Sequence, residues 1–210
     1  MLGRKQFLNY AIGVAALCVL CLGAAAFQRR SPRAIAASIG SRIADGDLRT
    51  FLGTERASIA TVFVDLTCPH SRQLLLDIEK TEHARGNYVQ LRYVPLNDEV
   101  ARELALLGIC TRQLSIGQSV GRLVAIGSLS TTRLDWVAVD SLFGRGPTMR
   151  LKECAAGRYA QSQLGTDLRL AYQIGVVRSP SLIVGSYLIQ GRPPAPVLRS
   201  LLKVDQALLR

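Results

Sequence analysis

The sequence predicts an α/β domain with a helical insertion, preceded by one apolar N-terminal segment. Three observations support this fold class. A β-branched apolar run is followed by a helix and a second strand, about 75 residues of helical pattern come next, and two short strands and an amphipathic helix close the chain. Alternation of this kind builds a layered α/β domain. The length of 210 residues suits one such domain plus an anchor.

Composition excludes several classes of protein. Hydrophobic residues make up 49% and charged residues 20% of the chain, which is typical neither of a disordered protein nor of a multi-pass membrane protein. The net charge is +11, but the first 33 residues hold five basic residues and no acid, and the later arginines are scattered singly. Aromatic residues, at 6%, are too sparse for base-stacking platforms. We expect no nucleic-acid partner.

The N-terminal segment is predicted to enter a membrane. Residues 7–27 are almost entirely apolar and, as a helix, would measure about 31 Å, enough to cross the hydrocarbon core of a bilayer. Basic residues precede them, as in a signal anchor. Ala24-Ala25-Ala26 offers a signal-peptidase site, although two arginines follow it closely. We therefore predict that residues 1–30 form a single-pass anchor, with cleavage and secretion as the alternative. Charges on the two sides of the segment are nearly balanced and do not fix its orientation.

The pattern of residues 31–94 predicts a linker, followed by a strand, a helix and a second strand. Residues 31–49 are interpreted as a linker with a short helix over 33–44. A buried strand is expected at 59–64, a helix at 69–84, and a second strand at 88–94.

The rest of the chain completes a domain predicted to span residues 50–208. A helical insertion is expected from about 98 to 172, with breaks at Gly117, 127–132 and 144–147. A hairpin then follows at 181–184 and 187–190, and a closing helix at 195–209.

The residues that could carry chemistry lie where the first strand meets its helix, at Cys68-Pro69-His70-Ser71. Unpaired N–H groups and the helix dipole favour a thiolate on Cys68, and a protonated His70 would add positive charge. A thiolate is the attacking species in disulfide exchange. Pro69 suits the first helical position, which needs no N–H donor.

Four segments resemble DsbA-like thioredoxin-fold proteins, in the same order and with similar spacing. The stretch Phe63–Ser71 resembles that family's F-x-D-x-x-C-P-x-C segment, and residues 175–181 resemble its G-V-x-G-T-P-T loop, whose proline is cis. The other two similar segments are residues 52–57 and 93–96, and Gly191 matches the glycine after the hairpin. The resemblance covers roughly residues 50–203 and implies a thioredoxin-like fold with an inserted helical subdomain.

Two departures from the family pattern bear on function. Ser71 stands where the family has its second cysteine, so Cys68 has no resolving thiol three residues on. Ser71 could instead donate a hydrogen bond to the Cys68 thiolate. Arg178-Ser179 replaces Gly-Thr before Pro180. If Pro180 is cis, as the resemblance implies, the Ser179 backbone would face Cys68 and hold an extended substrate chain.

Each candidate residue has a simpler interpretation. Cys68 could be inert and His70 a solvated helix-start residue. Asp65 resembles the family's aspartate near the motif, or is a hydrogen-bonded residue at the strand end. Cys110 and Cys154 are possible secondary thiols: Cys110 suits a buried apolar position, Cys154 falls where relatives often carry a cysteine, and the two could pair. Two histidines and no paired cysteine motif argue against a metal site, and no cofactor motif is present.

The sequence therefore predicts a monothiol thiol-disulfide oxidoreductase, anchored in the membrane and facing the periplasm or cell exterior. Cys68 and His70 would be catalytic, Ser179 and Pro180 would bind substrate, and the partners would be cysteine-containing client proteins or a small thiol. The alternative is a redox-inactive thioredoxin-fold module that binds or assembles partners at the membrane.

Overall fold

The computed structural model describes residues 32–43, 60–82, 89–96, 98–116, 120–130 and 132–202. The predicted anchor at residues 1–30 lies outside these ranges. Among the helices that are described, none has the length and apolar character to cross a membrane.

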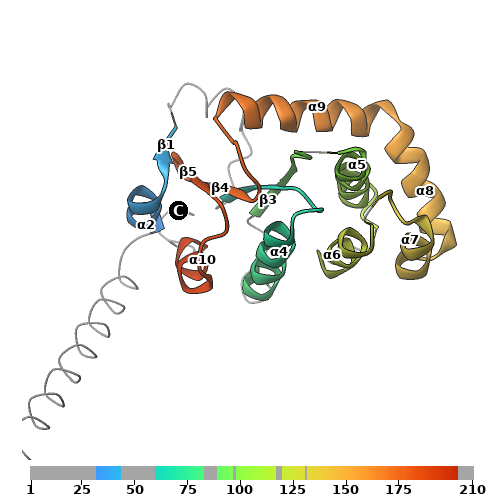
Figure 1. Ribbon diagram of the computed structural model, residues 1–210, viewed down its shortest axis with the longest axis horizontal. Helices are drawn as coiled ribbons and strands as arrows, with labels where there is room; N and C mark the ends of the chain where they lie inside the picture. Colours follow the sequence, from blue (N-terminus) through green and yellow to red (C-terminus); the bar gives the residue numbers. More distant parts are fainter. Residues whose placement is uncertain are drawn as a thin grey trace, which may run out of the picture.

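One five-stranded sheet forms the centre of the described domain, in the order β1-β5-β4-β2-β3 (Figure 1). Its strands are β1 Ser41–Arg42, β2 Ala60–Val64, β3 Val89–Tyr93, β4 Ser181–Val184 and β5 Tyr187–Gln190. β2 runs parallel to β3 and antiparallel to β4, while β5 pairs antiparallel with both β4 and β1. Because β2 and β3 are parallel, they need a crossover connection, and α4 (Pro69–Glu82) lies between them in the chain.

The helices form two groups (Figure 1). α2 (Pro32–Ile39), α4 and α10 (Ala195–Leu201) lie together on one side of the sheet, with α10 in contact with both of the others. The second group forms the insertion between β3 and β4; its first four helices lie beyond one edge of the sheet, and its last helix runs back to contact β3. Its members are α5 Glu99–Gln113, α6 Val120–Leu129, α7 Trp136–Phe143, α8 Arg145–Ala156 and α9 Arg158–Gln173.

Strand β2 is buried on both of its faces. Val62 and Val64 belong to a large core that extends through the helices, whereas Phe63 belongs to a smaller core beside the end of α9. Successive side chains of a strand point to opposite faces, so both faces of β2 are covered. The segment Cys68-Pro69-His70-Ser71, which comes shortly after β2, therefore starts from a strand that is packed on both faces.

The described part of the segment expected to be a linker, residues 32–43, belongs to the folded domain. In α2, Ile35 and Ala36 are fully buried, and β1 adds an edge strand to the sheet beside β5. Residues 32–43 therefore pack into the same domain as the described residues of the predicted 50–208. The apolar spacing of a short helix shows which face will be buried but not which distant elements will cover it.

The predicted breaks in the insertion are partly wrong. Gly127 lies inside α6, because a Cβ at this position would stand 2.5 Å from the Leu66 carbonyl oxygen and only glycine lets the two segments approach so closely. Conversely, Gly157 separates α8 from α9, a break that was not predicted. Gly117 lies outside the described residues. The predicted hairpin is confirmed, with the same bounds for both strands.

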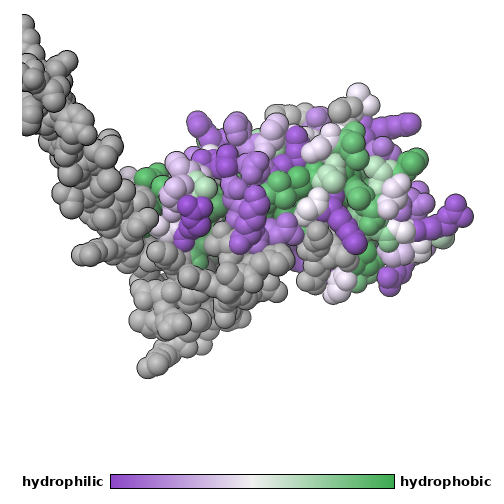
Figure 2. Space-filling model, turned by 90° about the horizontal axis from the view of Figure 1, so that it is seen from below, coloured by the Kyte–Doolittle hydropathy of each residue, from purple (hydrophilic) through white to green (hydrophobic). Residues whose placement is uncertain are grey.

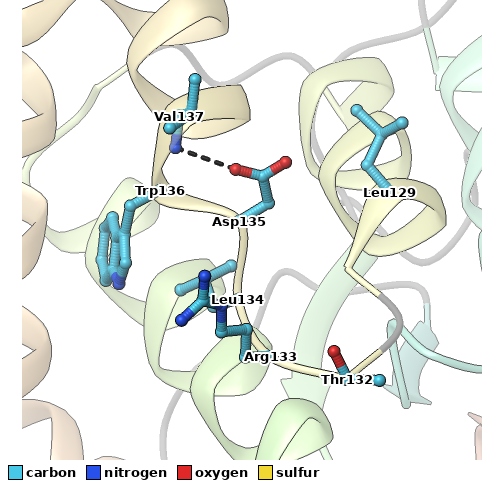
Figure 3. Close-up of a pocket in the computed structure, with 7 residues that line it drawn as sticks. All are labelled: Leu129, Thr132, Arg133, Leu134, Asp135, Trp136 and Val137. Atoms are coloured by element: carbon cyan, nitrogen blue, oxygen red, sulfur yellow. Dashed lines mark hydrogen bonds between the residues drawn. The ribbon is translucent and has the colours of Figure 1, made fainter.

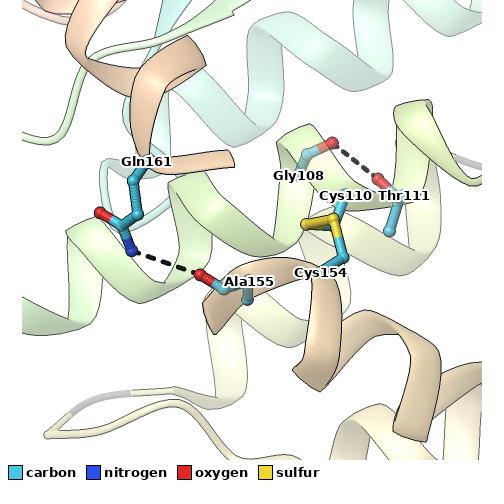
Figure 4. Close-up of a disulfide and its surroundings, with 6 residues drawn as sticks. All are labelled: Gly108, Cys110, Thr111, Cys154, Ala155 and Gln161. Atoms are coloured by element: carbon cyan, nitrogen blue, oxygen red, sulfur yellow. Dashed lines mark hydrogen bonds between the residues drawn. A yellow bond between two sulfur atoms is a disulfide. The ribbon is translucent and has the colours of Figure 1, made fainter. Parts of the chain in front are cut away.

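A disulfide joins two helices of the insertion (Figure 4). Cys110 of α5 and Cys154 of α8 are bonded, with 5.9 Å between their Cα atoms. The pairing that the sequence left open is therefore present, and neither residue is a secondary thiol. The Cys110 side chain is also fully buried, as its apolar neighbours indicate.

A buried carboxylate holds the insertion to the sheet. Asp167 of α9 accepts a hydrogen bond from the Arg92 guanidinium (2.9 Å) and another from the Tyr93 backbone N–H (3.1 Å). Burial raises the pKa of Tyr93 well above its ordinary value, so its phenol stays neutral. Its ring packs directly against Gly108 of α5, where a Cβ would lie 2.3 Å from the ring.

Removal of the disulfide is expected to destabilise the domain. The bond closes a separation of 44 residues, so Cys110→Ala/Cys154→Ala should lose about 2–4 kcal/mol of unfolding free energy. Urea unfolding of the variant measures this loss, and a reductant should lower the stability of the wild-type chain by the same amount. Equal stability of variant and wild type would contradict the assignment of the disulfide as a structural tie.

Candidate active site

Cys68 occupies the residue just before α4. Its carbonyl accepts the first hydrogen bond of the helix, from the Arg72 N–H at 3.1 Å, and its own N–H donates to the Asp65 carbonyl at 3.1 Å. Pro69 takes the first helical position, where no N–H is needed. Cys68 is half-buried, and it is the free thiol within the described part of the chain. The sulfur thus lies at the positive end of the helix and is open to a reaction partner.

The loop before β4 faces this sulfur. The peptide bond between Ser179 and Pro180 is cis, as the resemblance implies. The Cys68 Sγ atom lies 3.4 Å from the Ser179 carbonyl oxygen, to which the thiol donates a hydrogen bond. Only a protonated thiol can make this bond, so it is released when the sulfur ionises or reacts. Pro180 is buried, and its carbonyl accepts a hydrogen bond from Gly191.

Ser71 contacts the same loop rather than the thiol. Its Oγ lies 2.7 Å from the Ser179 Oγ, which also accepts a hydrogen bond from the Asp65 N–H at 2.7 Å. Ser71 is fully buried. The expected hydrogen bond from Ser71 to Cys68 is absent among the described contacts, because the Ser179 hydroxyl satisfies Ser71 instead. Ser71 therefore joins α4 to the cis-proline loop.

Asp65 shapes the turn between β2 and Cys68. Its buried carboxylate accepts hydrogen bonds from the Thr67 N–H (2.8 Å), the Thr67 hydroxyl (2.7 Å) and the Leu96 N–H (3.1 Å). With three donors already bound, the carboxylate stabilises the loop, as expected of a hydrogen-bonded residue at a strand end.

Two exposed residues close to this site along the chain, His70 and Arg178, are a histidine and an arginine. His70 lies in the first turn of α4, and Arg178 directly precedes Ser179. Neither side chain has a hydrogen-bond or ion-pair partner in the part of the chain that is described. Both are therefore available to a substrate.

Arg72 is a site residue that the sequence reasoning missed. Its guanidinium donates to the carbonyls of Leu66, Thr67 and Gly127, at 2.9, 2.7 and 3.3 Å. Its position in the sequence could have indicated this role, because it lies four residues after Cys68 and therefore on the same side of the helix start.

A separate cavity of about 490 Å³ lies in the helical insertion and includes none of the predicted site residues (Figure 3). It is lined by Leu129, Thr132, Arg133, Leu134, Asp135, Trp136 and Val137. Asp135 is engaged in capping α7, since its carboxylate accepts from the N–H groups of Val137 and Ala138. The apolar surface of the insertion visible in Figure 2 is in keeping with the exposure of Leu129 and Val137.

The architecture is a thioredoxin-like fold with a helical insertion, and the solved structures that share it are DsbA-like thioredoxin-fold oxidoreductases. No protein-family model matches the chain, and no curated protein matches it. The thiol-disulfide exchange protein alpha-DsbA2 from Wolbachia pipientis superposes with a TM-score of 0.59 at 18% identity, over 73% of this chain and 91% of that one.

Two further structures support the same fold. A thioredoxin-like oxidoreductase from Silicibacter pomeroyi DSS-3 has a TM-score of 0.56 and 20% identity, over 73% of this chain and 88% of that one. A periplasmic thioredoxin-like protein from Salmonella enterica serovar Typhimurium has a TM-score of 0.51 and 18% identity, over 81% of this chain and all of its own. The fold of this chain is therefore DsbA-like, and its chemistry must be argued from its own residues.

The role of Asp65 in the turn can be tested with Asp65→Asn. The amide nitrogen of asparagine would face one of the three donors, so we expect a loss of about 1–3 kcal/mol in unfolding free energy. Asp140→Asn serves as the control, because that side chain has no hydrogen bond in the described structure. Unchanged stability of Asp65→Asn, together with lost Cys68 reactivity, would show that Asp65 acts on the thiol rather than on the turn.

Proposed function

We propose that this protein is a monothiol thiol-disulfide oxidoreductase that reduces or isomerises disulfides of client proteins through Cys68. The observation that carries the proposal is the placement of a free, half-exposed sulfur at the start of α4, 3.4 Å from the carbonyl that precedes a cis-proline. The DsbA-like fold supports it.

The proposed chemistry proceeds by successive thiol-disulfide exchanges, two for isomerisation and three for reduction. The Cys68 thiolate attacks one sulfur of a client disulfide, a new bond forms between Cys68 and that sulfur, and the client's other sulfur leaves as a thiolate. For isomerisation, a thiolate of the client attacks the mixed disulfide and regenerates Cys68. For reduction, two molecules of an external small thiol supply the two electrons: the first releases the client, and the second frees Cys68 as the small disulfide forms.

Ser179 is proposed to hold the client chain. Its backbone N–H has no partner within the described part of the chain, and its carbonyl is released when Cys68 reacts. The loop before it is fixed in advance, because the Gln190 side chain accepts from the Val177 N–H and donates to the Gly175 carbonyl. An extended segment can therefore pair with Ser179 without first ordering the loop.

Ser71 and His70 have different proposed roles. Ser71 cannot displace a client from sulfur, so the mixed disulfide persists until another thiol arrives. His70 is exposed in the first turn of α4, where its protonated form would favour the thiolate.

An extracytoplasmic location, with residues 7–27 as the anchor, is part of the proposal. The Cys110–Cys154 disulfide supports it, since such bonds persist in oxidising compartments. The Salmonella enterica protein of the same fold is described as periplasmic.

Alkylation tests whether Cys68 is a nucleophile. At pH 6, iodoacetamide should modify Cys68 of the folded full-length chain at least about tenfold faster than the same cysteine in urea, because the folded helix start favours the thiolate. Mass spectrometry separates Cys68 from Cys18 and Cys21. No acceleration, combined with normal cellular function of Cys68→Ala, would contradict the proposal and favour a redox-inactive binding module.

Restoring a second cysteine tests the monothiol mechanism. In Ser71→Cys, a mixed disulfide between Cys68 and a peptide thiol should be released at least about tenfold faster in the absence of external thiol, because the attack becomes intramolecular. Ser71→Ala also breaks the contact with Ser179 but adds no thiol, and should show no acceleration. Equally rapid release from the wild-type chain would mean that another group resolves the intermediate.

A further inference from the structure

We propose that Arg72 is a positioning residue for Cys68, coupling the reactivity of the sulfur to the helical insertion. The inference rests on the proposed role of Cys68 as a nucleophile. The two hydrogens of a single Arg72 nitrogen, Nη1, are shared among three carbonyls: those of Leu66 and Thr67 in the turn before Cys68, and that of Gly127 in α6.

The two peptide units before Cys68 are held at both ends. In the first, the Leu66 carbonyl accepts from Arg72 and the Thr67 N–H donates to the Asp65 carboxylate. In the second, the Thr67 carbonyl accepts from Arg72 and the Cys68 N–H donates to the Asp65 carbonyl. The backbone that places the sulfur is therefore fixed between Asp65 and Arg72.

The geometry of α4 explains how the Arg72 side chain reaches the turn before Cys68. Arg72 follows Cys68 by four residues, and its N–H closes the first turn of α4 on the Cys68 carbonyl. Side chains of a helix lean toward its N-terminus, so the long arginine side chain runs back to the turn that enters the helix.

Gly127 brings the insertion into the same contact. A Cβ on Gly127 would lie 2.5 Å from the Leu66 oxygen and 3.4 Å from the Arg72 Cδ, so α6 packs its backbone directly on the turn. A displacement of α6 would therefore move the peptide units before Cys68, through the contact of Gly127 with Leu66 and the hydrogen bond from Arg72 to the Gly127 carbonyl.

The charge of Arg72 is also uncompensated locally. All three acceptors are neutral carbonyls, and no carboxylate of the described residues forms an ion pair with this guanidinium. One of the acceptors, the Thr67 carbonyl, belongs to the peptide bond that leads into Cys68. The positive charge thus lies beside the peptide bond that leads into Cys68 and adds to the partial charge of the helix start.

The test compares Arg72→Gln with Arg72→Lys in the full-length chain. Arg72→Gln should slow alkylation of Cys68 at pH 6 about tenfold and move the pH profile of the rate to higher pH, because a charge and its hydrogen bonds are lost. Arg72→Lys, which keeps the charge and three donors, should restore most of the rate. The control is Arg192→Gln, which removes another arginine bound to α4, through Asp77, and should leave the rate unchanged.

The outcomes separate this inference from the proposed function. Slow alkylation of the wild-type chain itself would overturn the role of Cys68. A fast wild type and an Arg72→Gln variant with the same rate and pH profile would overturn the role of Arg72 alone.

If Arg72→Gln does not fold, Gly127→Ala decides the matter. That variant leaves Arg72 in place but pushes the Leu66 carbonyl, and it should slow alkylation although residue 127 lies 59 positions from Cys68 in the sequence. Wild-type reactivity of a folded Gly127→Ala would contradict the proposed coupling.

Discussion

The site depends on the contact between the cis-proline loop and the start of α4. Ser179 is the residue through which this contact is made: its carbonyl faces the Cys68 sulfur, and its hydroxyl meets both the Ser71 hydroxyl and the Asp65 N–H. Because Ser71 is fully buried, separating the two segments would leave a polar group without a partner in the protein interior. The Cys68 sulfur and the proposed docking backbone are thus held together by the same few hydrogen bonds.

The serine at position 71 changes the chemistry without changing the fold. It stands where the DsbA-like pattern has a second cysteine, and its hydroxyl forms a hydrogen bond with Ser179. A dithiol site donates or accepts a complete disulfide, whereas a single thiol can only exchange partners. The proposed function therefore follows from one side chain, while the similarity to solved oxidoreductases shows the architecture in which that side chain lies.

Local patterns predicted the regular elements around the site well. The apolar β-branched run and the proline after Cys68 predicted β2 and the start of α4, and the pattern over residues 181–190 predicted the hairpin at its observed bounds. The contacts that assemble the site could not be predicted in this way. Ser71 and Ser179 are 108 residues apart, and their hydrogen bond replaces the one expected between Ser71 and Cys68.

The structural meaning of Gly127 also depends on contacts that are distant in the sequence. In a sequence, Gly127 marks either the end of a helix or a place where two backbones approach closely, and only the position of Leu66 in space decides between them. Arg72 likewise looks like an ordinary surface cation of α4 until the carbonyls that it binds are known.

The most direct test of the account is to trap and map mixed disulfides of the full-length chain in the cells that produce it. Acid quenching followed by thiol blocking preserves the intermediates, and peptide mapping identifies the cysteine involved. The account predicts client peptides joined to Cys68 in the wild-type chain and absent from Cys68→Ser. Client peptides joined only to Cys18 or Cys21, or no mixed disulfide at all, would contradict it.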